Sequence, residues 1–142
     1  MGRTLPWLNI KMSPLVNIRI LDEHEIPERP GVYIMLSDKI EYTYPWSEKR
    51  GTSQVFYIGQ SSNLRSRLLI HQKHCIGAKD NPDPTYYYYY PRYEYAAYRG
   101  CNVCWATCTT KAEARKTEED LLFEFANYFG AKPVANGQSA WR

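Results

Sequence analysis

The sequence predicts a small mixed α/β (α+β) domain, in which a three-stranded antiparallel sheet is flanked by helices. Two segments centred on Val32 and Phe56 are rich in β-branched and aromatic residues and are bounded by proline or glycine, which predicts strands. Residues 62–75 and 111–129 carry apolar side chains at helical spacing behind good helix caps, which predicts the helices. At 142 residues the chain is long enough for one domain with a hydrophobic core.

Composition narrows the class of protein. Hydrophobic residues make up 44% of the chain and charged residues 23%, as in an ordinary globular domain. The chain has no apolar stretch of about 18 residues, so we expect no membrane span. Residues 1–7 lack the apolar run of a signal peptide, so we expect a cytoplasmic protein. The net charge of +3 is compatible with a nucleic-acid partner.

Two tripeptides mark the first two strands, Gly31-Val32-Tyr33 and Tyr57-Ile58-Gly59. Each places a tyrosine beside a glycine, where another group can approach the backbone closely. A polar loop over residues 37–50 joins the two strands and is long enough to reach a substrate.

Further strands are predicted on either side of this pair. Residues 95–107 supply the third strand, after a tyrosine-rich insertion at about residues 77–98. Residues 15–21 alternate in polarity and predict an extra edge strand, within an N-terminal extension of residues 1–28 that precedes the main domain of residues 29–142.

Five consecutive tyrosines, Tyr86–Tyr90, lie in the insertion and allow three interpretations. Their rings can stack on unpaired bases, with Arg92 and Arg99 contacting phosphates. They can equally cover the sheet or form the contact of a homodimer.

The first predicted helix covers residues 62–75, with Ser61 or Ser62 as its N-cap. One stripe of this helix should face the sheet and consists of Leu64, Leu68 and Cys75. The adjacent stripe contains Arg67, His71 and His74. A cation with two imidazoles beside a buried face is typical of a site, although a solvated basic face would look the same.

The second predicted helix begins after Thr110, which forms a capping box with Glu113, and ends at Gly130. Its buried side should contain Ala114, Leu121, Leu122, Phe125 and Phe129. Glu118 projects into the middle of that side and Glu119 lies on its flank, so periodicity does not choose between them. A buried carboxylate is costly unless it binds a cation or strong hydrogen-bond donors, which makes this pair a candidate site.

The four cysteines allow two interpretations. Cys101-x-x-Cys104 resembles half of a zinc knuckle, for which only His74 and Cys75 could supply distant ligands. Alternation along a strand, however, turns Cys101 away from the face that Cys104 and Cys108 share. The pattern therefore favours reduced, buried thiols over a structural zinc site.

The order of these features resembles the GIY-YIG nuclease family over residues 30–136. Gly31-Val32-Tyr33 corresponds to the first family tripeptide, with valine in place of isoleucine, and Tyr57-Ile58-Gly59 matches the second. One departure is Gln60, since repair-type members often carry a lysine there. This argues against a close relative of the excision-repair nuclease and leaves the general base open.

The resemblance also implies a set of site residues. The essential arginine of the family corresponds to Arg67, ten residues after Tyr57, and a histidine of some members corresponds to His71. The helix glutamate of the family corresponds to Glu118, and its late asparagine to Asn136. The implied catalytic residues are Tyr33, Tyr57, Arg67, His71, Glu118 and Asn136.

The activity implied by the resemblance is that of a metal-dependent DNA endonuclease, acting on double- or single-stranded DNA. One Mg²⁺ (or Mn²⁺) would be held by Glu118, because a lone carboxylate suits one mostly hydrated ion. Arg67 would pair with phosphate oxygens, and Asn136 would orient a phosphate or the tyrosines. The two tyrosines would hold or deprotonate the water, although His71 is the easier base at neutral pH. Nucleic-acid contacts are expected of Arg65, Lys73, His74, Arg92 and Arg99.

Two other functions stay open at this point. The same fold can serve as a non-catalytic nucleic-acid-binding module. The second alternative is a zinc-binding interaction domain. In that case the matches to the two tripeptides arose by chance.

Overall fold

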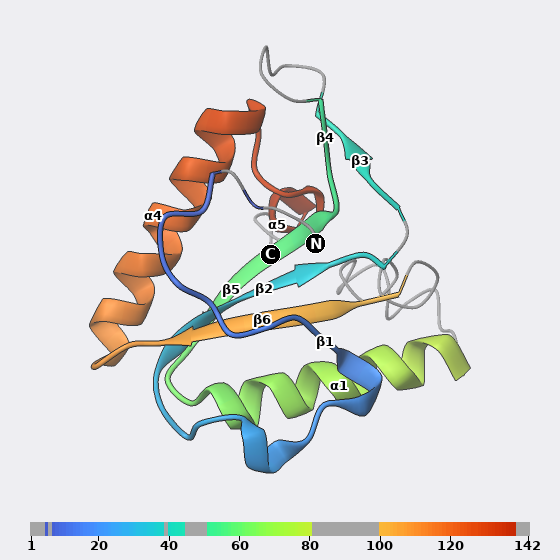
Figure 1. Cartoon of the computed structure of the whole chain (residues 1–142), viewed down its shortest axis with the longest axis vertical. Helices are drawn as coiled ribbons and strands as arrows, with labels where there is room; N and C mark the ends of the chain where they lie inside the picture. The colour runs from blue at the N-terminus through green and yellow to red at the C-terminus, as the bar shows by residue number, and fades with distance from the viewer. Residues whose placement is uncertain (1–4, 6, 39, 45–50, 81–99, 139–142) are drawn as a thin grey trace.

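A four-stranded antiparallel sheet forms the centre of the computed structural model, with helices on both of its faces (Figure 1). The structure describes residues 5, 7–38, 40–44, 51–80 and 100–138, and gives only the backbone at 78–80 and 137–138. The tyrosine tract with Arg92 and Arg99 lies outside these residues, so its three interpretations stay predictions.

The strand order is β1-β6-β2-β5, with β2 (Gly31–Leu36) in the middle. The two predicted tripeptides lie on β2 and on the outer strand β5 (Val55–Ser61). On the other side of β2 lies β6 (Asn102–Thr107), the third predicted strand.

The sheet has four strands, where the main prediction had three. The fourth is β1 (Val16–Asn17), which pairs with β6. It corresponds to the predicted extra edge strand, but it is shorter than residues 15–21. The Asn17 side chain accepts a hydrogen bond from the Arg19 N–H and starts a 3₁₀ helix over Ile18–Ile20, which ends the strand. A second 3₁₀ helix follows at Glu23–Glu25.

The predicted loop of residues 37–50 contains part of a small second sheet, β3 (Tyr42–Thr43) paired with β4 (Thr52–Ser53). The Tyr44 hydroxyl fastens this sheet to the domain. It donates a hydrogen bond to the Val55 carbonyl at 3.2 Å and accepts one from the Val134 N–H at 3.1 Å.

Helix α1 (Leu64–Asp80) begins later and ends later than predicted. Asn63 is its N-cap, because its side chain accepts a hydrogen bond from the Ser66 N–H at 3.1 Å. The predicted caps Ser61 and Ser62 are wrong, since the Ser61 hydroxyl instead accepts from the Asn63 N–H. Gly77 lies inside the helix, so the predicted insertion does not start there.

Helix α4 (Lys111–Phe129) confirms its predicted caps. The Thr110 hydroxyl accepts a hydrogen bond from the Glu113 N–H at 3.0 Å, and Gly130 ends the helix with φ of 88°. The short helix α5 (Val134–Gln138) follows. In the described part of the chain, no helix has the length and apolar character that crossing a membrane requires.

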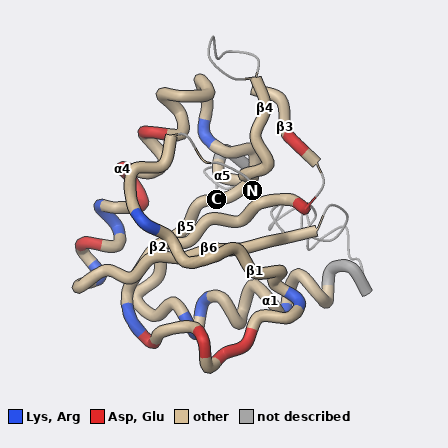
Figure 2. The backbone as a smooth tube through the Cα atoms, viewed as in Figure 1, with Lys and Arg blue, Asp and Glu red and all other residues tan. Residues whose placement is uncertain are grey.

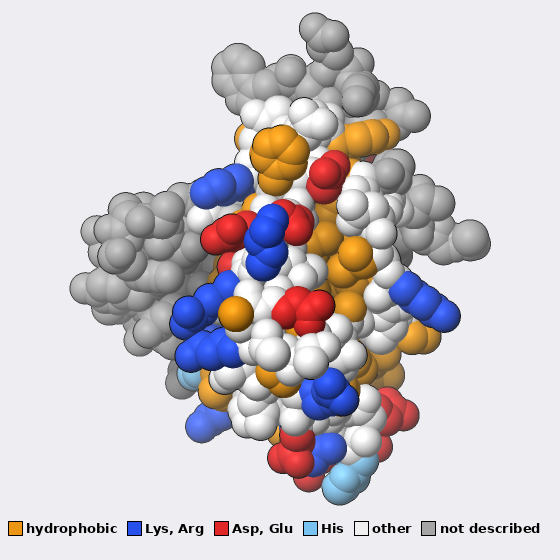
Figure 3. Space-filling model, turned by 90° about the vertical axis from the view of Figure 1, so that its left-hand side faces the viewer, with side chains coloured by type: hydrophobic (Ala, Val, Ile, Leu, Met, Phe, Trp, Pro, Cys, Tyr) orange, Lys and Arg blue, Asp and Glu red, His pale blue; other side chains and the backbone are white. Residues whose placement is uncertain are grey.

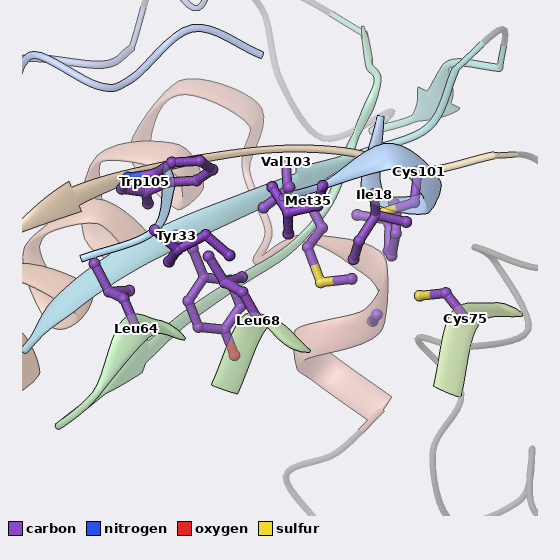
Figure 4. Close-up of a cluster of buried hydrophobic side chains, with 13 residues drawn as sticks. Ile18, Tyr33, Met35, Leu64, Leu68, Cys75, Cys101, Val103 and Trp105 are labelled. Carbon is purple, nitrogen blue, oxygen red and sulfur yellow. The ribbon is translucent and has the colours of Figure 1, made fainter. Parts of the chain in front are cut away.

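The sheet separates two hydrophobic cores, as Figure 1 shows from the positions of α1 and α4. The α1-side core, drawn in Figure 4, contains Leu64, Leu68 and Cys75 as predicted, together with Ile18 from the N-terminal segment. The α4-side core includes Trp7 from the N-terminal segment and Leu121, Phe125 and Phe129 from α4. Leu122 is half-buried, whereas the other predicted members of that helix face are buried. Residues 1–28 therefore contribute to both cores.

The cysteines follow the predicted alternation. Cys101 belongs to the α1-side core and Cys104 to the α4-side core, so the two lie on opposite faces of the sheet. All four cysteines are buried free thiols.

A glycine pair tests how tightly α1 packs on the sheet. A Cβ at Gly31 would lie 2.5 Å from the Leu64 Cδ1 atom and would overlap the Ala106 carbonyl oxygen. We expect Gly31→Ala to lower the free energy of unfolding by about 1–3 kcal/mol, measured by urea denaturation.

The matched control is Gly77→Ala, where a Cβ meets nothing within 4 Å. That substitution should stabilise the protein by about 0.5–1 kcal/mol, because alanine is the better helix former. Equal effects of the two substitutions would contradict the packing described at Gly31.

Candidate active site

Three aromatic side chains meet between the sheet and α1. The Tyr33 hydroxyl, on β2, is hydrogen-bonded to the His71 Nε2 atom, on α1, at 2.7 Å. The Tyr57 ring, on β5, lies with its centroid 6.2 Å from that of Tyr33 and 6.3 Å from that of His71. The structure thus brings together three of the predicted site residues, which are far apart in the sequence.

Exposure differs within this cluster. Tyr33 and His71 are each only 1% exposed, whereas Tyr57 is half-buried. Two polar side chains buried this deeply need a hydrogen-bond partner, and each supplies one to the other. Tyr57 is therefore the member that a bound ligand can contact.

Gly59 makes room for the Tyr33 ring. Tyr33 lies directly opposite Gly59 in the pairing of β2 with β5. A Cβ at position 59 would lie 2.5 Å from the Tyr33 Cζ atom and nearer still to its hydroxyl oxygen. The glycine of the second tripeptide thus lets the tyrosine of the first cross the strand toward His71.

A β-bulge places Phe56 on the same face of the sheet as Tyr57. Tyr57 lies opposite Met35 and Val55 lies opposite Leu36, so Phe56 is the extra residue on β5. Phe56 and Tyr57 consequently both pack on the α1-side core, although neighbouring residues of a regular strand would face opposite sides. Strict alternation could not have placed both rings there.

The cations predicted on α1 have different surroundings. Arg67 is exposed and lies one helical turn before His71, and Lys73 is also exposed, whereas His74 is half-buried. Arg65 instead holds the segment that leads into β2. Its Nε donates to the Ile26 carbonyl at 2.8 Å, and its Nη1 lies 3.6 Å from a Glu28 carboxylate oxygen. These contacts give Arg65 a structural task that the sequence did not indicate.

Glu118 lies on α4, on the other face of the sheet. It is half-buried, while Glu119 is exposed, so the structure separates two residues that periodicity left equivalent. Burial and the negative charge of Glu119 raise the pKa of the Glu118 carboxyl, and the positive charge of Lys132 opposes this. Partial desolvation and the negative charge of Glu119 both favour binding of a proton or a metal ion at Glu118, and the Lys132 charge opposes it.

Asn136, on α5, forms two hydrogen bonds with the backbone of β5. Its Oδ1 accepts from the Ile58 N–H at 2.9 Å and its Nδ2 donates to the Ile58 carbonyl at 2.8 Å. The side chain thus pairs with the outer edge of the sheet as a neighbouring strand would. Because Ile58 follows Tyr57 directly, Asn136 fixes the strand at the point where Tyr57 projects.

Among the residues that the structure describes, no group of three or more His, Cys, Asp or Glu side chains could hold a metal ion. Glu118 with its partial burial still fits a single, mostly hydrated divalent ion, which needs only one or two carboxylates. Thiols and imidazoles are the usual ligands of zinc, and the opposite facing of Cys101 and Cys104 does not favour their convergence on one ion.

Lys132 was not singled out from the sequence. It is exposed and close enough to lower the pKa of Glu118. Only its position just before Pro133 and Asn136 could have pointed to it. Gln60, the residue at which the sequence departs from the family pattern, has its Oε1 atom buried without a hydrogen-bond partner among the described residues.

No protein-family model, curated protein or solved structure matches this chain. The resemblance to GIY-YIG nucleases therefore rests on the sequence motifs.

The Tyr33–His71 hydrogen bond gives a first prediction for the site. We expect Tyr33→Phe to destabilise the protein by about 1–3 kcal/mol, because a buried hydrogen bond is lost without any change in ring packing. In a double-mutant cycle with His71→Asn, measured by urea denaturation, the double variant should be less destabilised than the sum of the two single variants, because the same hydrogen bond is lost in each. Additive effects of the two substitutions would show that the pair does not interact.

The raised pKa of Glu118 gives a pH-dependent prediction. Its folded pKa lies above its unfolded value, so the fold favours the protonated form, and stability is lost as pH rises through the interval between the two values. We expect Glu118→Gln to stabilise the metal-free protein at pH 7, by less than about 1 kcal/mol because solvent screens a half-exposed group. The gain should vanish below about pH 4, where the Glu118 carboxyl is protonated in both the folded and the unfolded state. Glu119→Gln is the exposed control, and an identical pH profile for it would contradict the assignment.

Proposed function

We propose that this protein is a metal-dependent DNA endonuclease with a GIY-YIG-like fold, which hydrolyses phosphodiester bonds. The observation that carries the proposal is the cluster of Tyr33, His71 and Tyr57, with the exposed Arg67 one helical turn away. Tyrosine, histidine and arginine are the residue types that orient water and bind a phosphate.

The catalytic site is proposed to cross the outer edge of β5. This strand is the last in the sheet, and both α1 and α4 pack against it. Asn136 joins α5 to that edge, and Lys132, which affects the pKa of Glu118, immediately precedes the Pro133–Val134 step into α5. These links support a single site with Tyr57 and Arg67 on one side and Glu118 on the other.

Each residue has a distinct task in this proposal. Tyr57 contacts the attacking water, because its hydroxyl belongs to the half-buried member of the cluster. Tyr33 and His71 are buried and hold the Tyr57 ring from behind, as positioning residues. Asn136 keeps β5 at a fixed distance from α5.

The phosphate and the ion are bound by groups of opposite charge. Arg67 pairs with two non-bridging phosphate oxygens through its planar guanidinium. The Glu118 carboxylate would hold one Mg²⁺ or Mn²⁺, which would supply positive charge to the developing phosphorane. Protonation of Glu118 competes with this ion, so activity should fall as the pH is lowered through its raised pKa.

The charges of the two helices favour α1 as the DNA-facing element. Between Leu64 and Gly77, α1 contains Arg65, Arg67 and Lys73 and no acidic residue, and its tube carries blue bands in Figure 2. The face over α4 mixes acidic and basic side chains (Figure 3). A phosphate backbone is attracted to the first surface more strongly than to the second. The proposed compartment is the cytoplasm, where the four thiols would stay reduced.

A cleavage assay tests the proposal. Supercoiled plasmid and single-stranded DNA are incubated with the full chain and Mg²⁺, Mn²⁺ or EDTA. We expect metal-dependent nicking or cutting that falls by at least about 100-fold in Arg67→Ala and in Glu118→Ala, because each removes charge stabilisation from the transition state. Unfolding curves show that the variants are folded.

Matched controls separate the site from the surface. Arg115→Ala removes an exposed cation of α4 and Glu119→Ala an exposed carboxylate, and both should retain nearly full activity. Wild-type rates in folded Arg67→Ala or Glu118→Ala protein would refute the site. DNA binding by fluorescence anisotropy without any cleavage would identify a non-catalytic binding module instead.

A further inference from the structure

Two cysteine thiols lie close together in the α1-side core. Cys75 lies on the C-terminal half of α1, and Cys101 lies just before β6. They are 4% and 3% exposed, and both belong to the same cluster of buried side chains. Figure 4 shows both side chains at the same end of the core, with Cys75 projecting from α1 toward the end of the sheet where Cys101 lies.

The other two cysteines lack this arrangement. Cys104 is buried in the α4-side core, on the opposite face of the sheet. The Cys108 Sγ atom lies 3.8 Å from the Thr117 hydroxyl oxygen. Of the four thiols, only Cys75 and Cys101 are therefore held together by the fold, and the nuclease proposal gives neither of them a task.

We propose that Cys75 and Cys101 are a redox modification site, at which a hydroperoxide converts the two thiols into an intramolecular disulfide. The position of both cysteines at one end of the same core bears on the first requirement, because a disulfide can form only where the backbone already holds two cysteines close together. Cys75 and Cys101 are separated by 26 positions in the chain. A disulfide between them would stabilise the folded state, because it would close a loop of this length and so restrict the unfolded chain.

The chemistry balances with one peroxide per pair. One thiol attacks the peroxide oxygen and becomes a sulfenic acid, releasing water. The second thiol attacks that sulfur, the S–S bond forms, and a second water leaves. The pair loses two electrons and two protons, and hydrogen peroxide is reduced to two waters. A dithiol reductant reverses the modification by thiol–disulfide exchange.

Burial determines how fast this reaction runs. Desolvation and the neighbouring Cys75 thiol raise the pKa of Cys101 well above its usual range, so its thiolate is scarce in the folded state. The reaction is therefore slow until the end of α1 opens. Once formed, the bond ties α1 to the start of β6, one helical turn beyond His71.

The test has a chemical and an equilibrium part. The reduced full chain is treated with hydrogen peroxide and mapped by mass spectrometry without reduction. We expect a loss of 2 Da in the peptide pair that contains Cys75 and Cys101, absent in Cys75→Ser and in Cys101→Ser and retained in Cys108→Ser. Linkage of any other pair, or oxidation of Cys108 with Cys75 and Cys101 still free, would overturn the proposal.

The equilibrium part does not depend on access of the oxidant. The chain is equilibrated in glutathione redox buffers, once folded and once in urea, and the fraction of the Cys75–Cys101 disulfide is measured. We expect the effective concentration of the two thiols to be at least about tenfold higher in the folded protein. An equal or lower value would show that the fold does not support the bond. Neither readout uses DNA cleavage, so the outcome is independent of the proposed nuclease activity.

Discussion

The buried hydrogen bond between Tyr33 and His71 is the interaction on which the geometry of the candidate site depends. Two polar side chains in a dry core must satisfy each other, so α1 can dock on the sheet only where the two groups meet. Gly59 permits this, because any side chain at that position would occupy the space of the Tyr33 ring. The two tripeptides therefore act together, because the glycine of the second leaves the space that the tyrosine ring of the first occupies.

The same contacts determine which side chain of the cluster is left partly exposed. Tyr33 and His71 fill the space beneath the strands, and Tyr57, opposite Met35 in the regular pairing of β5 with β2, is half-buried beside them. Arg67, one turn before His71, is exposed. The position of the Tyr57 ring thus follows from strand pairing and from the buried Tyr33–His71 interaction.

The outer edge of β5 is the second structural constraint. An unpaired edge strand invites association with other chains, and Asn136 closes it at Ile58 with two hydrogen bonds. Helix α5 also contacts both cores, since Ala135 belongs to the α1-side core and Val134 packs against both. Lys132, in the segment between α4 and α5, is exposed and lowers the pKa of the half-buried Glu118.

The sequence by itself determined the two predicted helices, the three main strands and the faces they bury, because these follow from periodicity and from caps such as Thr110 and Gly130. It also singled out Tyr33, Tyr57 and His71, which lie together in the structure. It did not predict the Asn63 cap, the Phe56 bulge, the structural contacts of Arg65 or the choice of Glu118 over Glu119 by burial. The Asn63 cap is a local contact with Ser66, for which Ser61 and Ser62 were equally suitable residue types. The other three depend on which backbone and side-chain groups meet across the fold, and local patterns carry no information about contacts between residues far apart in the chain.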